Sequence, residues 1–269
     1  GLLPDGLRRL RLMLATDGSE FSHAPQEIAI ALAQRFGITL DIMTSVQSPE
    51  DDEIARARLA VAAQAALAAG VDAENILRHG KQPVQEVVAA AAAADTNILI
   101  IGRRPLRGDI KEKLVGDIAA RIIAQAPCHV LVAGWQSRMW SRRILMVSDG
   151  SAASDRILEV TLQFARVTAT PVTVLAAASA RTRPQVEEDV ALKAGQIRLE
   201  GIDCDTRIIE TSSDQAVVQA AREACADLVV IGNHMMGSGV PDRIVGSLAC
   251  AVLVMHSGTA SPEIDSAVA

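Results

Sequence analysis

Arg11-Leu-Met-Leu-Ala-Thr-Asp-Gly-Ser19 returns later in the chain as Arg143-Ile-Leu-Met-Val-Ser-Asp-Gly-Ser151. Each copy is a short apolar run that ends in Asp-Gly-Ser, a pattern typical of a buried strand followed by a turn. Two further blocks of the first half recur in the same order in the second half. They pair residues 97–102 with 227–232 and residues 120–132 with 242–254. Three matched blocks in one order indicate an internal duplication.

The duplication predicts two domains of one kind. We expect the first over residues 1–134, the second over 143–257 and a flexible tail over 258–269. The join between the domains holds both tryptophans of the chain, Trp135 and Trp140. We expect them to pack across the domain–domain or subunit interface, with ligand stacking as the alternative.

Both copies alternate short, continuous apolar runs with longer stretches of helical periodicity. The runs predict strands at 12–16, 40–46, 75–79, 97–101 and 129–133, and at 144–148, 172–177, 206–210, 227–231 and 251–255. The longer stretches predict helices at 22–36, 51–69, 84–94 and 112–125, and at 152–168, 185–200, 213–224 and 241–248. Apolar runs without alternation indicate strands that are buried on both faces. The fold class is therefore α/β, with two tandem doubly wound, five-stranded parallel sheets of Rossmann-like order 3-2-1-4-5.

Composition narrows the classes of partner. Hydrophobic residues make up 49% of the chain, which is enough for packed cores. Aromatic residues are only 2%, Tyr is absent, and the formal net charge is −6. These values disfavour base stacking and a general electrostatic hold on nucleic acid, so no nucleic-acid partner is expected.

The cysteines and the apolar segments indicate the compartment. The four cysteines form no CxxC pair and no zinc-like spacing with histidine, so we expect reduced thiols and no metal. The chain starts at Gly1 with no basic-then-apolar leader, and its apolar helical stretches are too short to span a bilayer. We expect a cytoplasmic protein without direct membrane insertion. The missing initiator Met fits either a tag remnant or a fragment of a longer polypeptide.

In an open parallel sheet of this order, ligands bind beyond the carboxyl ends of strands 1 and 4. Asp17 and Gly102 follow those strands in the first copy, and Asp149 and Gly232 follow them in the second. A carboxylate there can accept hydrogen bonds from a ribose or an adenine, and glycine lets backbone N–H groups approach phosphate. The alternative role of the two aspartates is helix capping or turn formation. Among the histidines, only His234 is a candidate for ligand contact.

Enzyme motifs are missing from the sequence. It contains no G-x-x-x-x-G-K-[ST] loop and no G-x-S-x-G elbow, so neither a P-loop NTPase nor a typical serine hydrolase is indicated. We expect a protein that is not an enzyme.

A strand ending in Asp-Gly-Ser, a fourth strand ending in Gly, and Ala126-Pro-Cys-His-Val-Leu-Val132 together resemble the universal stress protein family. The resemblance covers both halves. It implies a five-stranded α/β domain that pairs through its last strand, and hence a homodimer by analogy. It also implies a role in stress tolerance and, for some members, binding of ATP or AMP through G-x2-G-x9-G-[ST]. Family binders contact adenine through backbone groups at the end of strand 2, which here are Ser45 and Ala177.

The first copy departs from the family's nucleotide pattern. Gly102 supplies the first glycine, but Pro105 stands where the next is expected, Gly116 comes one residue late, and Asp117 replaces the Ser or Thr. Proline removes a backbone donor and Asp117 places a carboxylate near the phosphates. Both features disfavour an ordinary ATP site in the first copy.

The second copy has a shorter segment between its fourth strand and its last strand. Gly232 and Cys250 are 18 residues apart, whereas Gly102 and Cys128 are 26 apart, so eight residues are lost. The repeat alignment places Gly246 inside the last helix, which favours the alternative phosphate-binding segment Gly237, Ser238 and Gly239. This copy is the better candidate for phosphate contact.

The sequence leaves three hypotheses for the function of the protein. The first is a non-enzymatic stress-response or regulatory protein that binds an adenine nucleotide, ATP or AMP, through one copy. The second is a ligand-free interaction module for an unknown protein partner, which includes the cytosolic regulatory domain of a membrane transporter. A slow ATPase is a third, weaker hypothesis because no base or metal carboxylate pair is evident.

Overall fold

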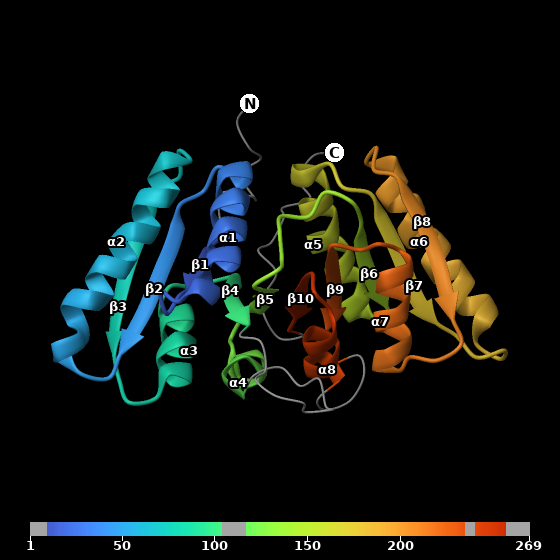
Figure 1. The fold of residues 1–269 in the computed structure, drawn as a ribbon. Helices are drawn as coiled ribbons and strands as arrows, with labels where there is room; N and C mark the ends of the chain where they lie inside the picture. The colour runs from blue at the N-terminus through green and yellow to red at the C-terminus, as the bar shows by residue number, and fades with distance from the viewer. Residues whose placement is uncertain (1–9, 104–116, 235–239, 257–269) are drawn as a thin grey trace. The chain divides into compact units, whose positions relative to one another are not determined.

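The computed structural model describes residues 10–103, 117–234 and 240–256. The described residues form two compact units, one made of 10–103 with 117–135 and the other of 136–234 with 240–256. Each unit is an α/β domain with five parallel strands (Figure 1).

The first unit has five strands and four α-helices. The strands are β1 (Leu12–Ala15), β2 (Leu40–Val46), β3 (Ala73–His79), β4 (Ile98–Arg103) and β5 (His129–Gly134). The α-helices are α1 (His23–Phe36), α2 (Asp52–Ala68), α3 (Pro83–Ala93) and α4 (Asp117–Gln125), and short 3-10 turns at Glu20–Ser22 and Pro49–Asp51 precede α1 and α2. All strand pairs are parallel, in the order β3-β2-β1-β4-β5.

The second unit repeats this plan. Its strands are β6 (Ile144–Ser148), β7 (Val172–Ala177), β8 (Cys204–Ile209), β9 (Leu228–Gly232) and β10 (Ala251–Met255). Its helices are α5 (Ala152–Thr168), α6 (Arg183–Leu199), α7 (Asp214–Glu223) and α8 (Val240–Ser247). The order is β8-β7-β6-β9-β10, again parallel. The predicted fold class and the order 3-2-1-4-5 are thus confirmed in both halves.

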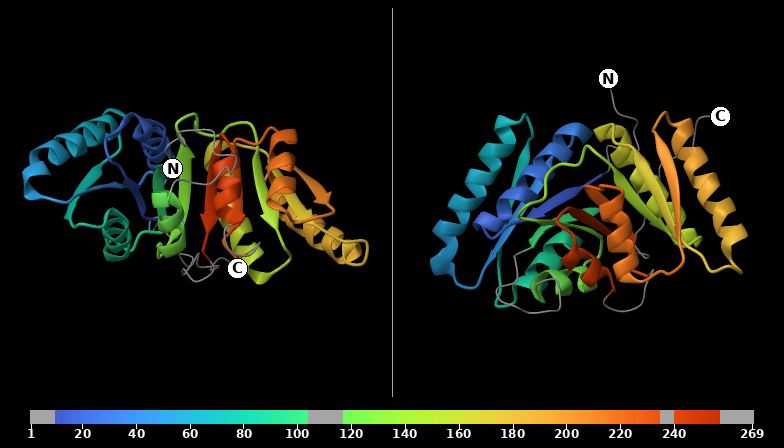
Figure 2. Two further views of the ribbon diagram at one scale, coloured as in Figure 1. Left: turned by 60° about the horizontal axis from the view of Figure 1, so that its bottom comes forward. Right: turned by 45° about the vertical axis from the view of Figure 1, so that its right-hand side comes forward.

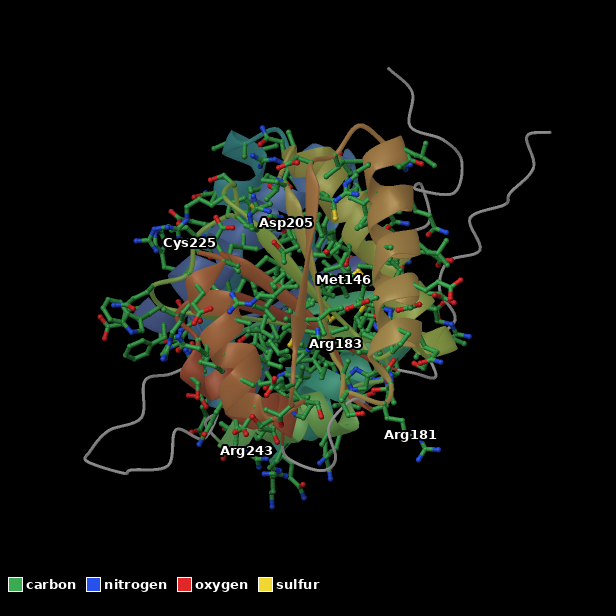
Figure 3. All side chains as sticks on the ribbon, turned by 90° about the vertical axis from the view of Figure 1, so that its right-hand side faces the viewer. Met146, Arg181, Arg183, Asp205, Cys225 and Arg243 are labelled. Atoms are coloured by element: carbon green, nitrogen blue, oxygen red, sulfur yellow. The ribbon has the colours of Figure 1, made fainter. Side chains whose placement is uncertain are left out.

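Helices cover both faces of each sheet because both faces are apolar. Leu12, Met13 and Leu14 follow one another in β1 and are fully buried, although alternate strand residues point to opposite faces. In the first unit α1 packs beside α2, and α3 packs beside α4 on the other face (Figure 2). In the second unit α6 and α7 lie on either side of the edge strand β8, which carries the exposed Asp205 (Figure 3).

The expectation for the tryptophans is wrong for Trp140. Its side chain is only 1% exposed and packs on Phe164 of α5, with ring centroids 5.3 Å apart, inside the core of the second unit. The approach to β6 is held in place by the Asp227 carboxylate, which accepts hydrogen bonds from the backbone N–H groups of residues 141–143. Trp140 is therefore part of the core of the second unit. Trp135 is 54% exposed in the first unit, and its expected interface role stays a prediction.

None of the helices in the described ranges is both long enough and apolar enough to cross a membrane.

Candidate functional site

Asp17 builds the turn that follows β1. Its Oδ1 accepts a hydrogen bond from the backbone N–H of Ser19 (2.9 Å) and another from the hydroxyl of Ser22 (2.8 Å). Gly18 adopts a left-handed φ of 68°, which an L side chain rarely tolerates. The turn thus fixes the carboxylate at the carboxyl end of the sheet, so turn formation is one of its roles.

Asp149 makes the same turn after β6. Its Oδ1 accepts hydrogen bonds from the backbone N–H of Ser151 (2.9 Å) and from the hydroxyl of Ser154 (2.6 Å), and Gly150 has a φ of 75°. Burial alone would raise the pKa of Asp149, but the hydrogen bonds from Ser151 and Ser154 and the nearby His234 outweigh it and lower the pKa. The carboxylate is therefore ionised at neutral pH.

The sheet register brings the first-unit candidates together. Ala15, the last residue of β1, pairs with Ile101 of β4 on one side and with Met43 of β2 on the other. Beyond these positions β1 ends, whereas β2 and β4 continue on either side of it to Val46 and Arg103. Asp17, Ser45 and Gly102 consequently line one cavity.

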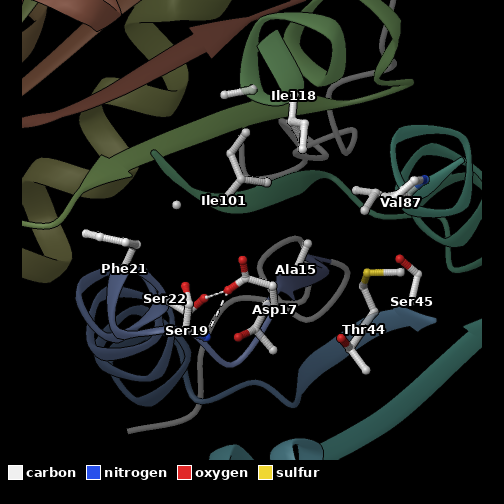
Figure 4. A pocket seen from close by; sticks show the side chains of 15 residues that line it. Ala15, Asp17, Ser19, Phe21, Ser22, Thr44, Ser45, Val87, Ile101 and Ile118 are labelled. Atoms are coloured by element: carbon white, nitrogen blue, oxygen red, sulfur yellow. Dashed lines mark hydrogen bonds between the residues drawn. The ribbon is translucent and has the colours of Figure 1, made fainter. Parts of the chain in front are cut away.

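This cavity has a volume of about 570 Å³ (Figure 4). Its apolar wall comes from β2, β4, the 3-10 turn before α1 and the first turns of α3 and α4, through Phe21, Met43, Val87, Ile101 and Ile118. The lining also includes five hydroxyl side chains, those of Thr16, Ser19, Ser22, Thr44 and Ser45. Such a lining suits a flat, mostly apolar group with a hydrogen-bonding edge.

Polar groups in the cavity are few and specific. Asp17 is the only ionisable side chain among the described residues that line it. The Ser19 hydroxyl is a buried oxygen without a hydrogen-bond partner, whereas its counterpart Ser151 donates to Asp149. A buried hydroxyl without a partner is costly, so a ligand that hydrogen-bonds to Ser19 would relieve that cost.

Gly102 is required for close packing at the cavity. A Cβ at this position would lie 3.0 Å from the backbone oxygen of Phe21 and 3.3 Å from Cγ of Pro25. A larger residue at this position would push the chain before α1 away from β4 by a few tenths of an ångström. Substituting it would therefore disturb the wall of the cavity, whether or not its N–H contacts a ligand.

The corresponding crevice of the second unit is smaller, about 180 Å³. Asp149 and Ala177 line it together with Ser148, Leu175 and Val217. Gly232, by contrast, is covered by the imidazole of His234, since a Cβ on Gly232 would lie 2.5 Å from Cε1 of that ring.

The predicted phosphate segments are not described by the structure. Gly116, Gly237, Ser238 and Gly239 lie outside the described residues, so their roles stay predictions. Gly246 lies within α8. In the described part of the chain, no group of three His, Cys, Asp or Glu side chains could hold a metal ion.

Sequence reasoning missed the apolar wall of the first cavity. Phe21, Val87, Ile101 and Ile118 give no motif, because apolar residues in strands and first helical turns are indistinguishable from core. The available signal was their position: each lies at the carboxyl end of the sheet or in a turn next to it.

Both units are doubly wound parallel α/β domains of the Rossmann-like class, and the first has a cavity beyond its first and fourth strands. The model of the universal stress protein family matches residues 9–134 and again 141–256. The chain belongs to the universal stress protein family, as a tandem of two such domains.

Individual relatives agree with this assignment. A Thermus aquaticus protein named as a universal stress protein in the QAH/OAS sulfhydrylase 3' region is 27% identical over 132 residues, 45% of this chain and 96% of its own. A solved universal stress protein from Archaeoglobus fulgidus superposes with a TM-score of 0.78 at 19% identity, covering 93% of this chain and all of its own. The cytoplasmic domain of a prokaryotic cation chloride cotransporter shares the fold, with a TM-score of 0.59 at 9% identity over 94% and 96% of the two chains.

Proposed function

We propose that this tandem universal stress protein is a non-enzymatic regulator of the stress response that senses an adenine nucleotide, AMP or ATP, in its first unit. The observation that carries the proposal is the cavity of about 570 Å³ where Asp17, Ser45 and Gly102 meet. Its volume falls within the range of small-molecule sites, and it lies where open α/β sheets bind their ligands.

Three zones of the cavity match three parts of a nucleotide. Met43 and Val87 offer an apolar slot for the adenine ring. Asp17 can accept hydrogen bonds from ribose hydroxyls, because its carboxylate is fixed by the turn after β1. The end at Gly102 and the start of α4 is the place for the α-phosphate, where the positive end of a helix favours an anion.

Ligand binding would change the surface next to α4. Ile118 belongs to the first turn of α4, lines the cavity and is 57% exposed. A ligand in the cavity would cover part of this side chain. We propose that an unknown protein partner recognises this surface and so distinguishes the occupied from the empty state.

The test is isothermal titration of the full chain with AMP and with ATP, with GMP as the control ligand, together with native mass spectrometry of the purified protein. We expect heat with the adenine nucleotides and weaker or no heat with GMP. No heat and no co-purified nucleotide, in a protein whose circular dichroism shows it is folded, would rule out the proposal.

The second candidate is a ligand-free interaction module, and the small second crevice of about 180 Å³ favours it for that unit. The fold shared with the cotransporter's cytoplasmic domain favours, within this second candidate, a regulatory domain of a larger membrane protein. The full reading frame of the gene decides that point, because a transporter would add membrane-spanning segments to this chain.

We further propose a cytoplasmic location and a homodimer. Cell fractionation tests the location, and light scattering coupled to size-exclusion chromatography tests the dimer. A monomeric mass at all concentrations would contradict the dimer.

A further inference from the structure

The second unit holds a side chain in the place where a ligand would bind. His234, two residues beyond β9, lays its imidazole over Gly232: a Cβ on that glycine would be 2.5 Å from Cε1 and 2.8 Å from Nδ1. The other ring nitrogen, Nε2, lies 3.4 Å from Oδ2 of Asp149. The ring therefore extends from the end of β9 to the turn after β6.

The same interval is open in the first unit. There Asp17 and Gly102, the counterparts of Asp149 and Gly232, line one cavity. Arg103, the counterpart of Asn233, turns its guanidinium toward β5, where a Cβ on Gly134 would lie 3.1 Å from Nη2. β5 is on the side of β4 away from β1. Arg104, the counterpart of His234, lies outside the described residues, so the contrast between the units rests on the cavity that Asp17 and Gly102 line.

We propose that His234 occupies the space between the ends of β6 and β9, beside the second crevice, so that the two units of one chain take up an adenosine-class ligand in sequence. The second unit fills only after the imidazole has moved away from Asp149 and Gly232. This inference rests on the proposed function for the identity of the ligand, and not for the role of His234.

The chemistry of the pair indicates what can replace it. His234 is a flat ring whose N–H can donate to a carboxylate oxygen that the turn holds in place. A ligand with a hydroxyl donor, such as the ribose of a nucleoside, can donate a hydrogen bond to Asp149 in its place. Leu175 and Ala177 already line an apolar slot beside it for the base.

The occupant is held weakly. Both side chains of the pair are partly exposed, and exposed ion pairs change an equilibrium by a factor of about five or less. A competing ligand therefore loses about this factor of affinity in the second unit. The consequence is a graded response, in which a further rise in ligand concentration fills the second unit.

Methyl NMR on the full chain, with labelled Ala, Leu and Val methyl groups and AMP as the probe, tests the order of filling. Val87 reports on the first cavity, and Leu175 and Ala177 report on the second. In the unmodified protein we expect Val87 to reach half-saturation first. In His234→Ala, we expect Leu175 and Ala177 to respond at an AMP concentration lower by up to about fivefold, with Val87 unchanged.

His23→Ala is the matched control. It removes an exposed histidine that lies 3.2 Å from Glu27 on α1, and it lines neither crevice. We expect it to leave both half-saturation points unchanged. The methyl spectra also report whether both units of each variant are folded, and His234→Ser serves as a second variant if the alanine change disturbs the second unit.

Two results would overturn the role of His234. One is that Leu175 and Ala177 respond to the same AMP concentration in the His234 variants as in the unmodified protein, or that none of the labelled methyl groups responds to AMP. The other is a second unit that fills at the same AMP concentration as the first, or at a lower one, in an unmodified protein whose Val87 also responds. If Val87 stays silent while Leu175 and Ala177 respond more readily in the variants, the proposed function of the first unit fails but the role of His234 stands.

Discussion

Arg58 of α2 and Asp189 of α6 occupy the same position, the seventh residue, of the two duplicated 17-residue helices, yet they carry opposite charges. The stem of Arg58 lies against Gly18 in the turn after β1. Asp189 accepts a hydrogen bond from Ser148 (3.1 Å), and its Oδ2 is 4.0 Å from where a Cβ on Gly150 would be. A cation therefore lies beside the Asp-Gly-Ser turn of the first unit, whereas the carboxylate beside the turn of the second unit is paired with Lys193.

Gly18→Ala should destabilise the first unit more than Gly150→Ala destabilises the second. Both glycines have a left-handed φ, 68° and 75°, which costs an L residue about 1–2 kcal/mol. Only at Gly18 would the new Cβ also clash, at 2.5 Å from Cδ of Arg58. Urea unfolding monitored by circular dichroism, with hydrogen exchange to assign the affected unit, measures both costs. Equal costs, or a difference that persists in an Arg58→Ala background, would contradict this explanation.

Lys193 of α6 should stabilise the second unit. It is only 5% exposed and contacts the carboxylate of Asp189 and that of Asp155, the latter at 3.2 Å. Lys193→Met keeps the volume but leaves two carboxylates without a cation. We expect a loss of about 1–3 kcal/mol, below the value for fully buried pairs because Asp155 is exposed. Fluorescence of Trp140 in a Trp135→Phe background measures unfolding of this unit.

The control for Lys193→Met is Asp155→Asn, which should cost less than about 1 kcal/mol because that side chain is exposed. The pH dependence gives a second check. Burial alone would lower the pKa of Lys193, but hydrogen bonds to Asp189 and Asp155 outweigh it and raise the pKa. A raised lysine pKa means that this stability is complete below about pH 10.4 and is lost as the pH rises through the folded pKa. In Lys193→Met, this alkaline loss should be missing.

The fold could be predicted from the sequence because each strand is a short apolar run buried on both faces. The positions of Asp17 and Gly102 could also be predicted from the sequence, because strand order alone places the ends of the first and fourth strands side by side. The location of Trp140 did not follow, because its partner Phe164 lies 24 residues further along and only tertiary packing brings them together. The placement of the His234 side chain could not be predicted either, because a sequence motif does not say whether a side chain points into a crevice or away from it.

The cysteines should react in the order of their exposure. Cys225 is exposed, whereas burial raises the pKa of Cys128 to about 12 and that of Cys204 to about 11. Because only the thiolate is nucleophilic, iodoacetamide at pH 8 should modify Cys225 first and reach Cys128 and Cys204 only on unfolding. Peptide mass spectrometry over time measures the order. Early modification of Cys128 in the folded protein would contradict the buried position.

Filling the first cavity should remove ligand binding while preserving the fold. Ala119 of α4 is buried and lines the cavity, so Ala119→Leu places three more carbon atoms where the ligand would lie. We expect the affinity for AMP to fall at least about tenfold, which corresponds to 1.4 kcal/mol. Ala124→Leu, on the exposed side of the same helix, is the matched control and should bind as the unmodified protein does. Equal affinities of the two variants would place the ligand elsewhere.

Asp117 should make the first site discriminate against phosphates. It is the first residue of α4, at the helix end where the backbone dipole favours anions, and the sequence has an acidic residue there instead of the family's Ser or Thr. Asp117→Ser removes the charge, so we expect affinity for ATP to rise about two- to fivefold, as for a charge at a helix terminus.

Adenosine provides the internal control for Asp117→Ser, because it has no phosphate and its affinity should stay unchanged. Calorimetric titration of both ligands into both proteins therefore isolates the electrostatic effect from any change in the shape of the cavity. If adenosine and ATP gained by the same factor, the substitution would have altered the shape instead. If ATP bound more weakly to Asp117→Ser, the carboxylate would be assisting phosphate binding, which would contradict the repulsion argued here.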